Sequence, residues 1–372
     1  MKIHGVSGLI VFIKKEAVLF IAAVFAFLSI VFVKPDARYF SYIDYSVLGI
    51  LFCLMVVVAG LKELGVFEYL SQWLLRRTSS VKSLSILLVS SVFVCSMFIT
   101  NDVALITFVP MTIGVFSRSA RKKLIFIVVM ETVAANLGSM MTPIGNPQNL
   151  YIYSFYRLHI LSFLKCVLPA GIVSYFIIIG FILIFQNGSI EFVIRQRVKL
   201  GNKKKLLLYY MGLFLLCIAA VFHILDYRIC VLIVLAATFM VDKKLLRKVD
   251  YSLLLTFVCF FVFAGNLERI GAVKDGLSLF LTDRVFVASV LCSQFISNVP
   301  AAMMISRFTE DTRNLLLGVN IGGLGTPVAS LASLISFRLY SRSIDAAPGR
   351  FLGIFTICNI SILVLLSCIV LL

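Results

Sequence analysis

The sequence predicts an all-α polytopic membrane protein built from two inverted repeats, each with a re-entrant hairpin and an interrupted helix. Three observations predict this fold: an apolar composition, basic residues placed between apolar windows, and an internal similarity between the halves. Of the 372 residues, 61% are hydrophobic. The core of a water-soluble protein could not bury so many apolar side chains. Windows without Asp, Glu, Lys or Arg that are long enough to cross a bilayer as helix occur at 206–225, 285–306, 314–337 and 351–372.

Basic residues are concentrated between the apolar windows. Lys and Arg number 34 against 17 Asp and Glu, a net charge of +17, with clusters at 121–123, 203–205 and 243–248. Because cytoplasmic loops are enriched in Lys and Arg, these clusters mark that side and argue against a nucleic-acid partner. Lys14 and Lys15 precede the first apolar segment, so we expect a multi-pass protein of the cytoplasmic (inner) membrane with a cytoplasmic N-terminus.

The apolar segments differ in how they are expected to enter the bilayer. The stretches 83–117 and 285–306 predict re-entrant hairpins, the first because basic residues flank both of its ends. The stretches 124–156 and 314–340 predict helices that are interrupted within the bilayer. Ordinary spans are expected near 17–33, 45–66, 160–186, 206–225, 229–241, 250–267 and 351–372.

Polar blocks recur in the same order in both halves of the chain. They predict one repeat at 1–186 and another at 229–372, separated by a cytoplasmic loop and a linking helix at 187–228. Because the linking helix adds a crossing, the repeats are inverted, which brings both hairpin tips toward the bilayer midplane. The matches are Asp44-Tyr45-Ser46 with Asp250-Tyr251-Ser252, Thr100-Asn101 with Ser297-Asn298, Asn136-Leu137-Gly138 with Asn320-Ile321-Gly322, and Thr142-Pro143 with Thr326-Pro327.

Polar, proline and glycine residues at the tips and breaks predict the substrate site. Pro143 and Pro147 each remove a backbone donor, so carbonyls freed around them can replace the hydration shell of an ion. Each break also starts a half-helix whose positive N-terminal end suits an anion, although a kink that only helps helices to pack is the alternative. The candidate binding residues are Thr100, Asn101, Asp102, Thr142, Pro143, Gly145, Asn146, Gln148, Asn149, Ser297, Asn298, Gly325, Thr326 and Ser330.

Asp102 and Glu131 are the acidic residues that we place deepest in the membrane. A carboxylate at that depth is costly unless it is paired or functional, so both are possible coupling carboxylates. The match of Asp102 in the second tip is Val299, an asymmetry that would let H⁺ or Na⁺ couple at one site. Two structural alternatives stay open: Asp102 as a hairpin cap, and Glu131 as a hydrogen-bond partner of a neighbouring helix.

Catalytic and metal-binding patterns have no support in the sequence. The nine cysteines are scattered singly through apolar stretches without a CxxC pair, and His4, His159 and His223 lie far apart. No catalytic triad, HExxH or phosphate-loop pattern occurs at usable spacing. We therefore expect no enzymatic activity, no metal site and no cofactor beyond a coupling ion, H⁺ or Na⁺.

The blocks TNDVAL at 100–105, TPIGNPQN at 142–149 and SNVPA at 297–301 resemble the ion transporter superfamily. Within it, the chain is similar to the citrate-transporter-like permeases, which include arsenite permeases, and more distantly to the divalent-anion:sodium symporters. The resemblance covers nearly the whole chain and implies a homodimer whose moving transport domain carries the tips and broken helices past a scaffold. It also implies roles near ion and substrate for Thr100, Asn101, Ser297 and Asn298, and in the unwound segments for Gly145, Asn146, Gly325 and Thr326.

One departure from the resemblance narrows the function. The dicarboxylate symporters carry Ser-Asn-Thr at both tips, whereas the third tip residue here is Asp102 or Val299, which argues against dicarboxylate transport. The sequence favours secondary transport of a small inorganic or organic anion, driven by H⁺ or Na⁺, across the lipid bilayer. The alternatives are a cation/proton antiporter, in which Asp102 binds the cation, and a passive channel, which the broken helices disfavour.

Overall fold

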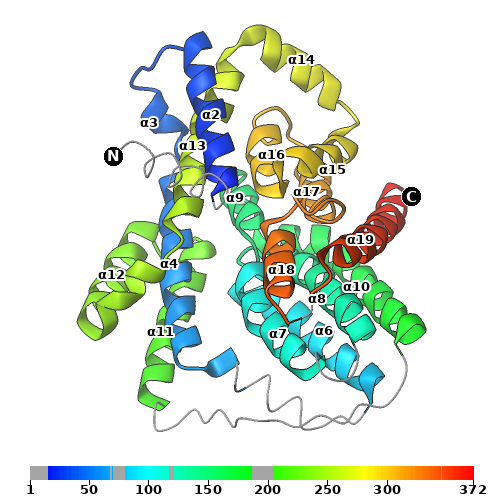
Figure 1. Ribbon diagram of the computed structural model, residues 1–372. Coiled ribbons are helices and arrows are strands. Elements are labelled where there is room, and N and C mark those ends of the chain that lie inside the picture. Colours follow the sequence, from blue (N-terminus) through cyan, green and yellow to red (C-terminus); the bar gives the residue numbers. More distant parts are fainter. Residues whose placement is uncertain (1–15, 68, 70–79, 117–120, 187–203, 345) are drawn as a thin grey trace, which may run out of the picture.

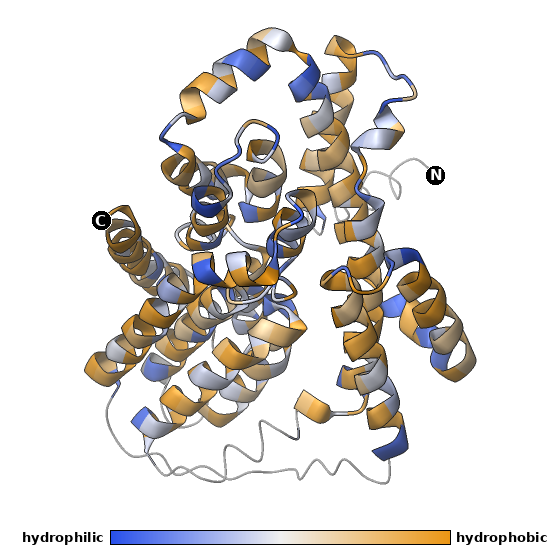
Figure 2. Ribbon diagram, turned by 180° about the vertical axis from the view of Figure 1, so that it is seen from behind, coloured by the Kyte–Doolittle hydropathy of each residue, from blue (hydrophilic) through white to orange (hydrophobic). Residues whose placement is uncertain are grey.

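The computed structural model describes residues 16–67, 69, 80–116, 121–186, 204–344 and 346–372, and helices make up most of these residues. The predicted all-α polytopic architecture is confirmed, since hydrophobic residues follow the helix shafts and hydrophilic residues gather near their ends (Figure 2). Lys14, Lys15 and the part of the predicted loop at 187–203 lie outside the described residues. Within the described part, six helices have the length and apolarity to cross a bilayer: Tyr45–Glu63, Val81–Ile99, Ile160–Phe185, Lys204–Val221, Tyr251–Arg269 and Pro348–Leu371.

Two groups of helices stand side by side in Figure 1, and we call the first the column. Within the column α2 packs on α13, while α11 and α12 pack on α4. Arg269 at the end of α13 pairs with Asp36 at 3.0 Å; although burial raises the pKa of this carboxyl, its bonds to Arg269 and Arg38 lower it below the usual value. The column comprises α2 (Ala17–Phe32), α3 (Tyr39–Tyr42), α4 (Tyr45–Glu63), α11 (Lys204–Val221), α12 (Tyr227–Asp242), η1 (Lys243–Lys248) and α13 (Tyr251–Arg269).

The second group, which we call the body, contains the segments predicted as hairpins and broken helices. Helix α14 (Gly271–Leu281) leads from the column to the body and meets α15 at an angle of 116°. The body comprises α6 (Val81–Ile99), α7 (Asn101–Phe116), α8 (Arg121–Ser139), α9 (Pro147–Phe155), α10 (Ile160–Phe185), α15 (Val285–Ile296), α16 (Asn298–Ile305), α17 (Thr312–Ile321), α18 (Leu331–Ser341) and α19 (Pro348–Leu371).

The helix ends follow the polar blocks of the sequence. Asp44 and Asp250, which match in the alignment, cap α4 and α13 by accepting backbone N–H groups. Asn146 and Ser330, which also match, cap α9 and α18 directly after the two breaks. Such caps each contribute about 1 kcal/mol, so the breaks end in defined helix starts.

The order of elements is the same in both halves. In each half a long helix is followed by two helices that meet at a tip and then by two that are separated by a break. The tips fall at residues 100 and 297, and the breaks at 140–146 and 322–330, within the stretches predicted for them. The opposite orientation of the halves in the bilayer stays a prediction.

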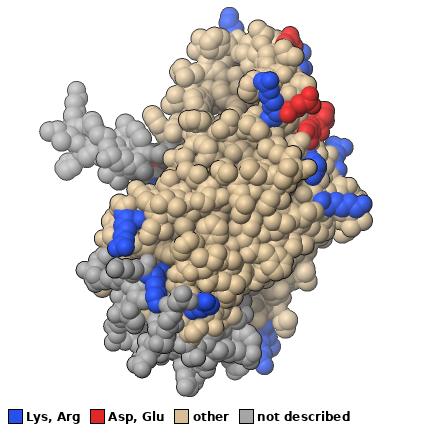
Figure 3. Space-filling model, turned by 90° about the vertical axis from the view of Figure 1, so that its right-hand side faces the viewer, with Lys and Arg blue, Asp and Glu red and all other residues tan. Residues whose placement is uncertain are grey.

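The surface shows how the molecule meets lipid. On the face in Figure 3 a broad band without coloured atoms separates basic residues near one end from mixed charges near the other. Large apolar side chains are exposed on the outer helices, among them Phe32, Phe185 and Phe239. In water such a band would be unfavourable, whereas hydrocarbon solvates it at no cost.

Close packing of α6 on α8 depends on Gly138, and its replacement tests this packing. A methyl group there would lie 2.2 Å from the backbone oxygen of Phe93. We expect Gly138→Ala to lower the apparent melting temperature of the detergent-purified protein by the equivalent of roughly 1–3 kcal/mol. Gly212→Ala on α11 is the control, because a methyl group there meets no atom within 4 Å. Equal melting temperatures for the Gly138 variant and the wild type would contradict this packing.

Candidate functional site

Each hairpin tip turns through one residue with a positive φ. Thr100 has φ 69° and ψ 149°, and its match Ser297 has φ 72° and ψ 155°. Residues other than glycine rarely adopt this conformation, and it persists only when the surroundings hold it. The two tips therefore share a strained backbone geometry as well as a sequence pattern.

Backbone hydrogen bonds attach each tip to the break of its own half. The N–H of Asn101 donates to the carbonyl of Gly145 at 3.2 Å, and the N–H of Asn298 donates to the carbonyl of Ala329 at 2.9 Å. Gly145 and Ala329 occupy matching positions. The exposed backbone of the tip and that of the break thus satisfy each other, as they must where water is scarce.

Threonine side chains give each half a second brace. The Thr142 hydroxyl donates to the carbonyl of Met97, and the matching Thr326 hydroxyl donates to the carbonyl of Gln294 at 3.0 Å. Gln294 also binds the second break, donating to the carbonyls of Gly322 and Leu324 at 2.8 and 3.0 Å. Thr142 and Thr326 therefore hold the breaks to the hairpins, a structural role within the predicted site.

The two halves meet in a group of buried amide and hydroxyl side chains that we call the amide cluster. Asn146 of the first break donates to Asn320 of α17 at 2.9 Å. Ser330 of the second break donates to Asn136 of α8 at 2.8 Å. Because Asn146 matches Ser330 and Asn136 matches Asn320, the contacts are reciprocal, as across a two-fold axis. The amide cluster comprises Asn101, Asn136, Asn146, Asn149, Asn320 and Ser330.

The amide cluster is neutral and tightly connected. Asn320 donates to Asn149 at 2.6 Å, and Asn101 donates to Asn136 at 3.3 Å. Every member is at most 5% exposed. Since a buried polar group without a partner is costly, the cluster fixes how the halves fit together.

Four helices begin around the cluster and the tips. Helices α7 and α16 start at Asn101 and Asn298, while α9 and α18 start at Pro147 and Leu331, next to their cap residues. Each helix N-terminus carries the equivalent of roughly half a positive charge. The arrangement therefore offers a positive potential without a Lys or Arg in the cluster, which suits a small anion or a polar oxyacid.

A cavity of about 390 Å³ reaches the first tip from the column side. Thr100, Asp102 and Pro147 line it from the body, and Lys62 and Asp250 are among its lining residues from the column. A neighbouring cavity of about 200 Å³ is also lined by Asp102 and Asp250, together with Arg338 of α18. The candidate site thus has an opening along the junction of column and body.

Asp102 faces this opening without a hydrogen bond to its carboxylate. Its Oδ1 is buried, and no group in the described part of the chain donates to it. The backbone N–H of Asp102 donates to the side chain of Asn101, the first residue of α7, at 2.9 Å. The contacts do not support the alternative that Asp102 is a hairpin cap.

Glu131 has a different setting. It is fully buried in α8, and one carboxylate oxygen accepts a hydrogen bond from Thr112 of α7 at 2.6 Å. No described group donates to the other oxygen, and Glu131 lines neither cavity at the first tip. The contact with Thr112 matches the alternative in which Glu131 bonds a neighbouring helix.

The remaining predicted residues lie close to this arrangement. Gln148 is buried in the first turn of α9, Pro143 is buried in the first break, and Gly325 has φ 100° beside Gln294 in the second. The residues predicted from sequence do not include Asn136, Asn320, Gln294 and Asp250. The first two could have been found, because they begin the matched blocks Asn-Leu-Gly and Asn-Ile-Gly. Asp250 also stands in a matched block, but only the fold brings it to the tip.

Interrupted helices that meet in a buried polar cluster, inside an apolar helical protein, define a membrane solute transporter. The chain belongs to the citrate transporter family, whose sequence profile matches residues 8–314. The similarity to the ion transporter superfamily that the motifs indicated is confirmed by this match. The family also points to transport and away from an enzymatic role.

Individual relatives agree with this assignment. The chain is 32% identical over 330 residues to an uncharacterized transporter of Methanocaldococcus jannaschii, covering 87% of this chain and 90% of the relative. It is 28% identical over 305 residues to the inner membrane protein YbiR of Escherichia coli, covering 80% of each. A shorter match, 35% identical over 147 residues, is to the silicon efflux transporter of Oryza sativa subsp. japonica, covering 39% of this chain and 30% of the rice protein.

Replacing Asn320 tests the amide cluster. Asn320→Leu keeps the volume but removes an acceptor of the Asn146 amide and the donor to the Asn149 Oδ1. Asn146 keeps its bond to Ser139, whereas the Asn149 oxygen is then buried without a hydrogen bond. We expect the free energy of unfolding to fall by roughly 1–3 kcal/mol for each polar group left without a partner, which is measured as a lower melting temperature in detergent. Asn314→Ala on the same helix is the control, since the side chain of this half-buried residue bonds only to Asp311 in its own turn. A similar effect of both changes would contradict the cluster.

Proposed function

We propose that the protein is an ion-coupled secondary transporter that carries a small inorganic or organic anion across the cytoplasmic membrane. One observation carries the proposal: four helix N-termini surround a neutral amide cluster, beside a cavity lined by a carboxylate that accepts no hydrogen bond from any described residue. The helix ends and amides suit the anion. The carboxylate of Asp102 suits a proton or Na⁺.

The division into column and body supports an elevator-type motion. Tips, breaks and amide cluster all belong to the body, and hydrogen bonds tie them into one unit. The cavity at Asp102 lies between this unit and the column. We propose that the body moves as a rigid unit along the column and carries the bound anion with it, and that the column provides the contact in a homodimer.

The chemistry of the cluster narrows the substrate class. A cluster of amides and hydroxyls provides directional hydrogen bonds but no full positive charge. It therefore suits small oxyanions and weak oxyacids better than multiply charged ions, which Arg forks bind more strongly. Two compounds for a test panel follow from the comparisons. Silicate is included because the rice relative is named for silicon efflux, and citrate because the family is named for citrate transport.

One observation favours a second candidate function, a cation/proton antiporter. Asp102 and Asp250 line the same two cavities, so two carboxylates from the body and the column face one space. Such a pair would bind a cation directly and need no anion. The two functions differ in whether flux requires an anion.

Proteoliposome transport separates these functions and tests Asp102. We expect accumulation of at least one of citrate, phosphate, silicate or arsenite when an H⁺ or Na⁺ gradient is imposed. In Asp102→Asn we expect the gradient to lose its effect, because the side chain can no longer change charge, while downhill exchange continues. Asp275→Asn on α14 is the control, an exposed carboxylate that lines neither cavity at the first tip.

The outcomes decide between the three functions. Na⁺/H⁺ exchange without any anion, abolished in Asp102→Asn, would establish the antiporter. Flux that follows voltage and never accumulates solute would indicate a passive channel. Anion accumulation that ignores both gradients, or a gradient effect that survives in Asp102→Asn, would contradict the proposed coupling.

A further inference from the structure

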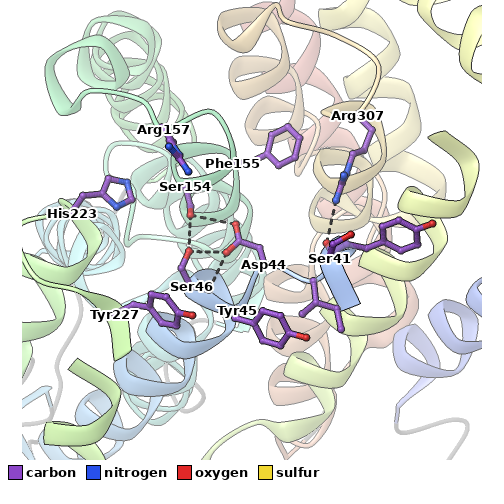
Figure 4. Close-up of a pocket in the computed structure, with 12 residues that line it drawn as sticks. Ser41, Asp44, Tyr45, Ser46, Ser154, Phe155, Arg157, His223, Tyr227 and Arg307 are labelled. Atoms are coloured by element: carbon purple, nitrogen blue, oxygen red, sulfur yellow. Dashed lines mark hydrogen bonds between the residues drawn. The ribbon is translucent and has the colours of Figure 1, made fainter. Parts of the chain in front are cut away.

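A third cavity, of about 760 Å³, lies at the N-terminal end of α4 (Figure 4), and Asp102 is not among its lining residues. Its wall comes from the column through Asp44, Ser46 and His223, and from the body through Arg157 and Arg307. It shares no lining residue with the two cavities at the first tip. Helix α9 begins at the amide cluster and ends at this cavity, a distance of about 13 Å at roughly 1.5 Å per residue.

The acceptors of the cavity wall are already in use. Asp44 is the one carboxylate among the lining residues, and its Oδ1 accepts the backbone N–H groups of Ser46 and Val47. Its Oδ2 accepts the Ser154 hydroxyl at 3.4 Å, as drawn in Figure 4. The carboxylate therefore caps α4 and bonds to α9, and these donors occupy both of its oxygens.

One part of the wall, formed by Arg157, His223 and Tyr227, has donors that are available to a ligand. The Arg157 side chain is exposed and has no ion pair or hydrogen bond within the described part of the chain. The Tyr227 hydroxyl accepts from Arg228 at 3.3 Å, which leaves its proton available to a ligand. His223 stacks on Tyr153 at a centroid distance of 5.7 Å, so its ring is held at the wall.

Arg307 fixes a second positive charge on the opposite wall. It binds Glu268 and the carbonyl of Tyr42, both at 3.2 Å, and its guanidinium lies 5.2 Å from the ring centre of Phe155. Its Nε–H is buried and has no partner among the described residues. A buried donor in this state favours an acceptor supplied from outside the chain.

Backbone strain is concentrated at the same cavity. Among the described residues, positive φ at positions other than glycine occurs at Thr100, Ser297, Asp283, Arg157 (48°) and His223 (58°). The first two are the hairpin tips of the candidate site, and the last two both line this cavity. Both follow helix ends where glycine is the ordinary choice. Arg and His at such positions indicate that their side chains have a function.

We propose that this cavity is a second anion site, which binds a small oxyanion such as phosphate or sulfate between Arg157 and Arg307, with His223 and Tyr227 as further donors. The Arg157 guanidinium has no partner among the described residues, so its fork can bind two oxygens of such an ion, and Arg307 contributes its charge and its unpaired Nε–H. The site is separate from the amide cluster, and binding to it does not depend on the transport cycle proposed above.

Protection of Arg157 from chemical modification tests the site directly. The purified protein is treated with phenylglyoxal in phosphate or in chloride of equal ionic strength, and modified arginines are quantified by peptide mass spectrometry. At about ten times its Kd, phosphate is expected to slow modification of Arg157 about tenfold, because only about one site in eleven is then unoccupied. Arg284 is the internal control, because it is exposed and lines none of the three cavities. Equal rates at Arg157 in both salts would overturn the proposal.

Two substitutions separate a binding role from a structural one. Arg157→Gly relieves the positive φ, so a purely structural residue would give a more stable protein that still gains stability from phosphate. We expect instead a higher melting temperature in chloride together with loss of most of the phosphate-induced shift. Arg157→Lys keeps the charge and is expected to keep part of that shift. An undiminished phosphate shift in Arg157→Gly would overturn the proposal.

A variant of the amide cluster distinguishes this site from the transport site. Asn146→Leu removes the contact to Asn320 and is expected to abolish transport in proteoliposomes. Protection of Arg157 by phosphate should persist in the same folded variant, which would support an independent site. Loss of protection together with transport would show that phosphate binds only through the amide cluster, against the proposal.

Discussion

The structure depends on one constraint: backbone that leaves the helical conformation inside an apolar protein must find hydrogen bonds within the chain. The tips and the breaks meet this requirement together. Asn101 and Asn298 donate from the tips to Gly145 and Ala329 in the breaks, so neither element is satisfied without the other. The polar residues that distinguish the sequence from an ordinary set of spans are those that this arrangement requires.

The same constraint explains why the candidate site is rigid. Side chains of the breaks hydrogen-bond across the molecule, Asn146 to Asn320 and Ser330 to Asn136, and all four are buried. A change within one half would leave donors of the other half without partners. Movement is therefore less costly at the junction of column and body, where cavities already separate the two groups.

Most of the fold can be predicted from the sequence because the polar blocks coincide with helix ends. Residue type and spacing place Thr100 and Ser297 at tips, and Asn146 and Ser330 at breaks, since proline, glycine and amides within an apolar stretch are rarely compatible with a regular spanning helix. Asn136 and Asn320 are not recognised as site residues in this way, because an amide inside a regular helix gives no local signal; only their matched positions in the two halves single them out. Asp250 and Arg157 are brought to cavities by contacts between distant segments, which no local pattern encodes.

Equivalent positions in the two halves make different contacts, and this difference bears on how column and body move. Asp44 accepts a hydrogen bond from Ser154 of α9, whereas its match Asp250 makes no ion pair with Arg338, the match of Ser154, although both line one cavity. A hydrogen bond thus joins column and body at the start of α4, whereas the matching pair at the start of α13 is not in contact. If the halves are related by a two-fold axis, the proposed motion exchanges the two contacts. The hydrogen bond between Asp44 and Ser154 breaks, and Arg338 comes close enough to Asp250 to form an ion pair. The stronger pairing of Arg with Asp would then favour the second state, so the asymmetry of the two contacts would bias the resting position of the body.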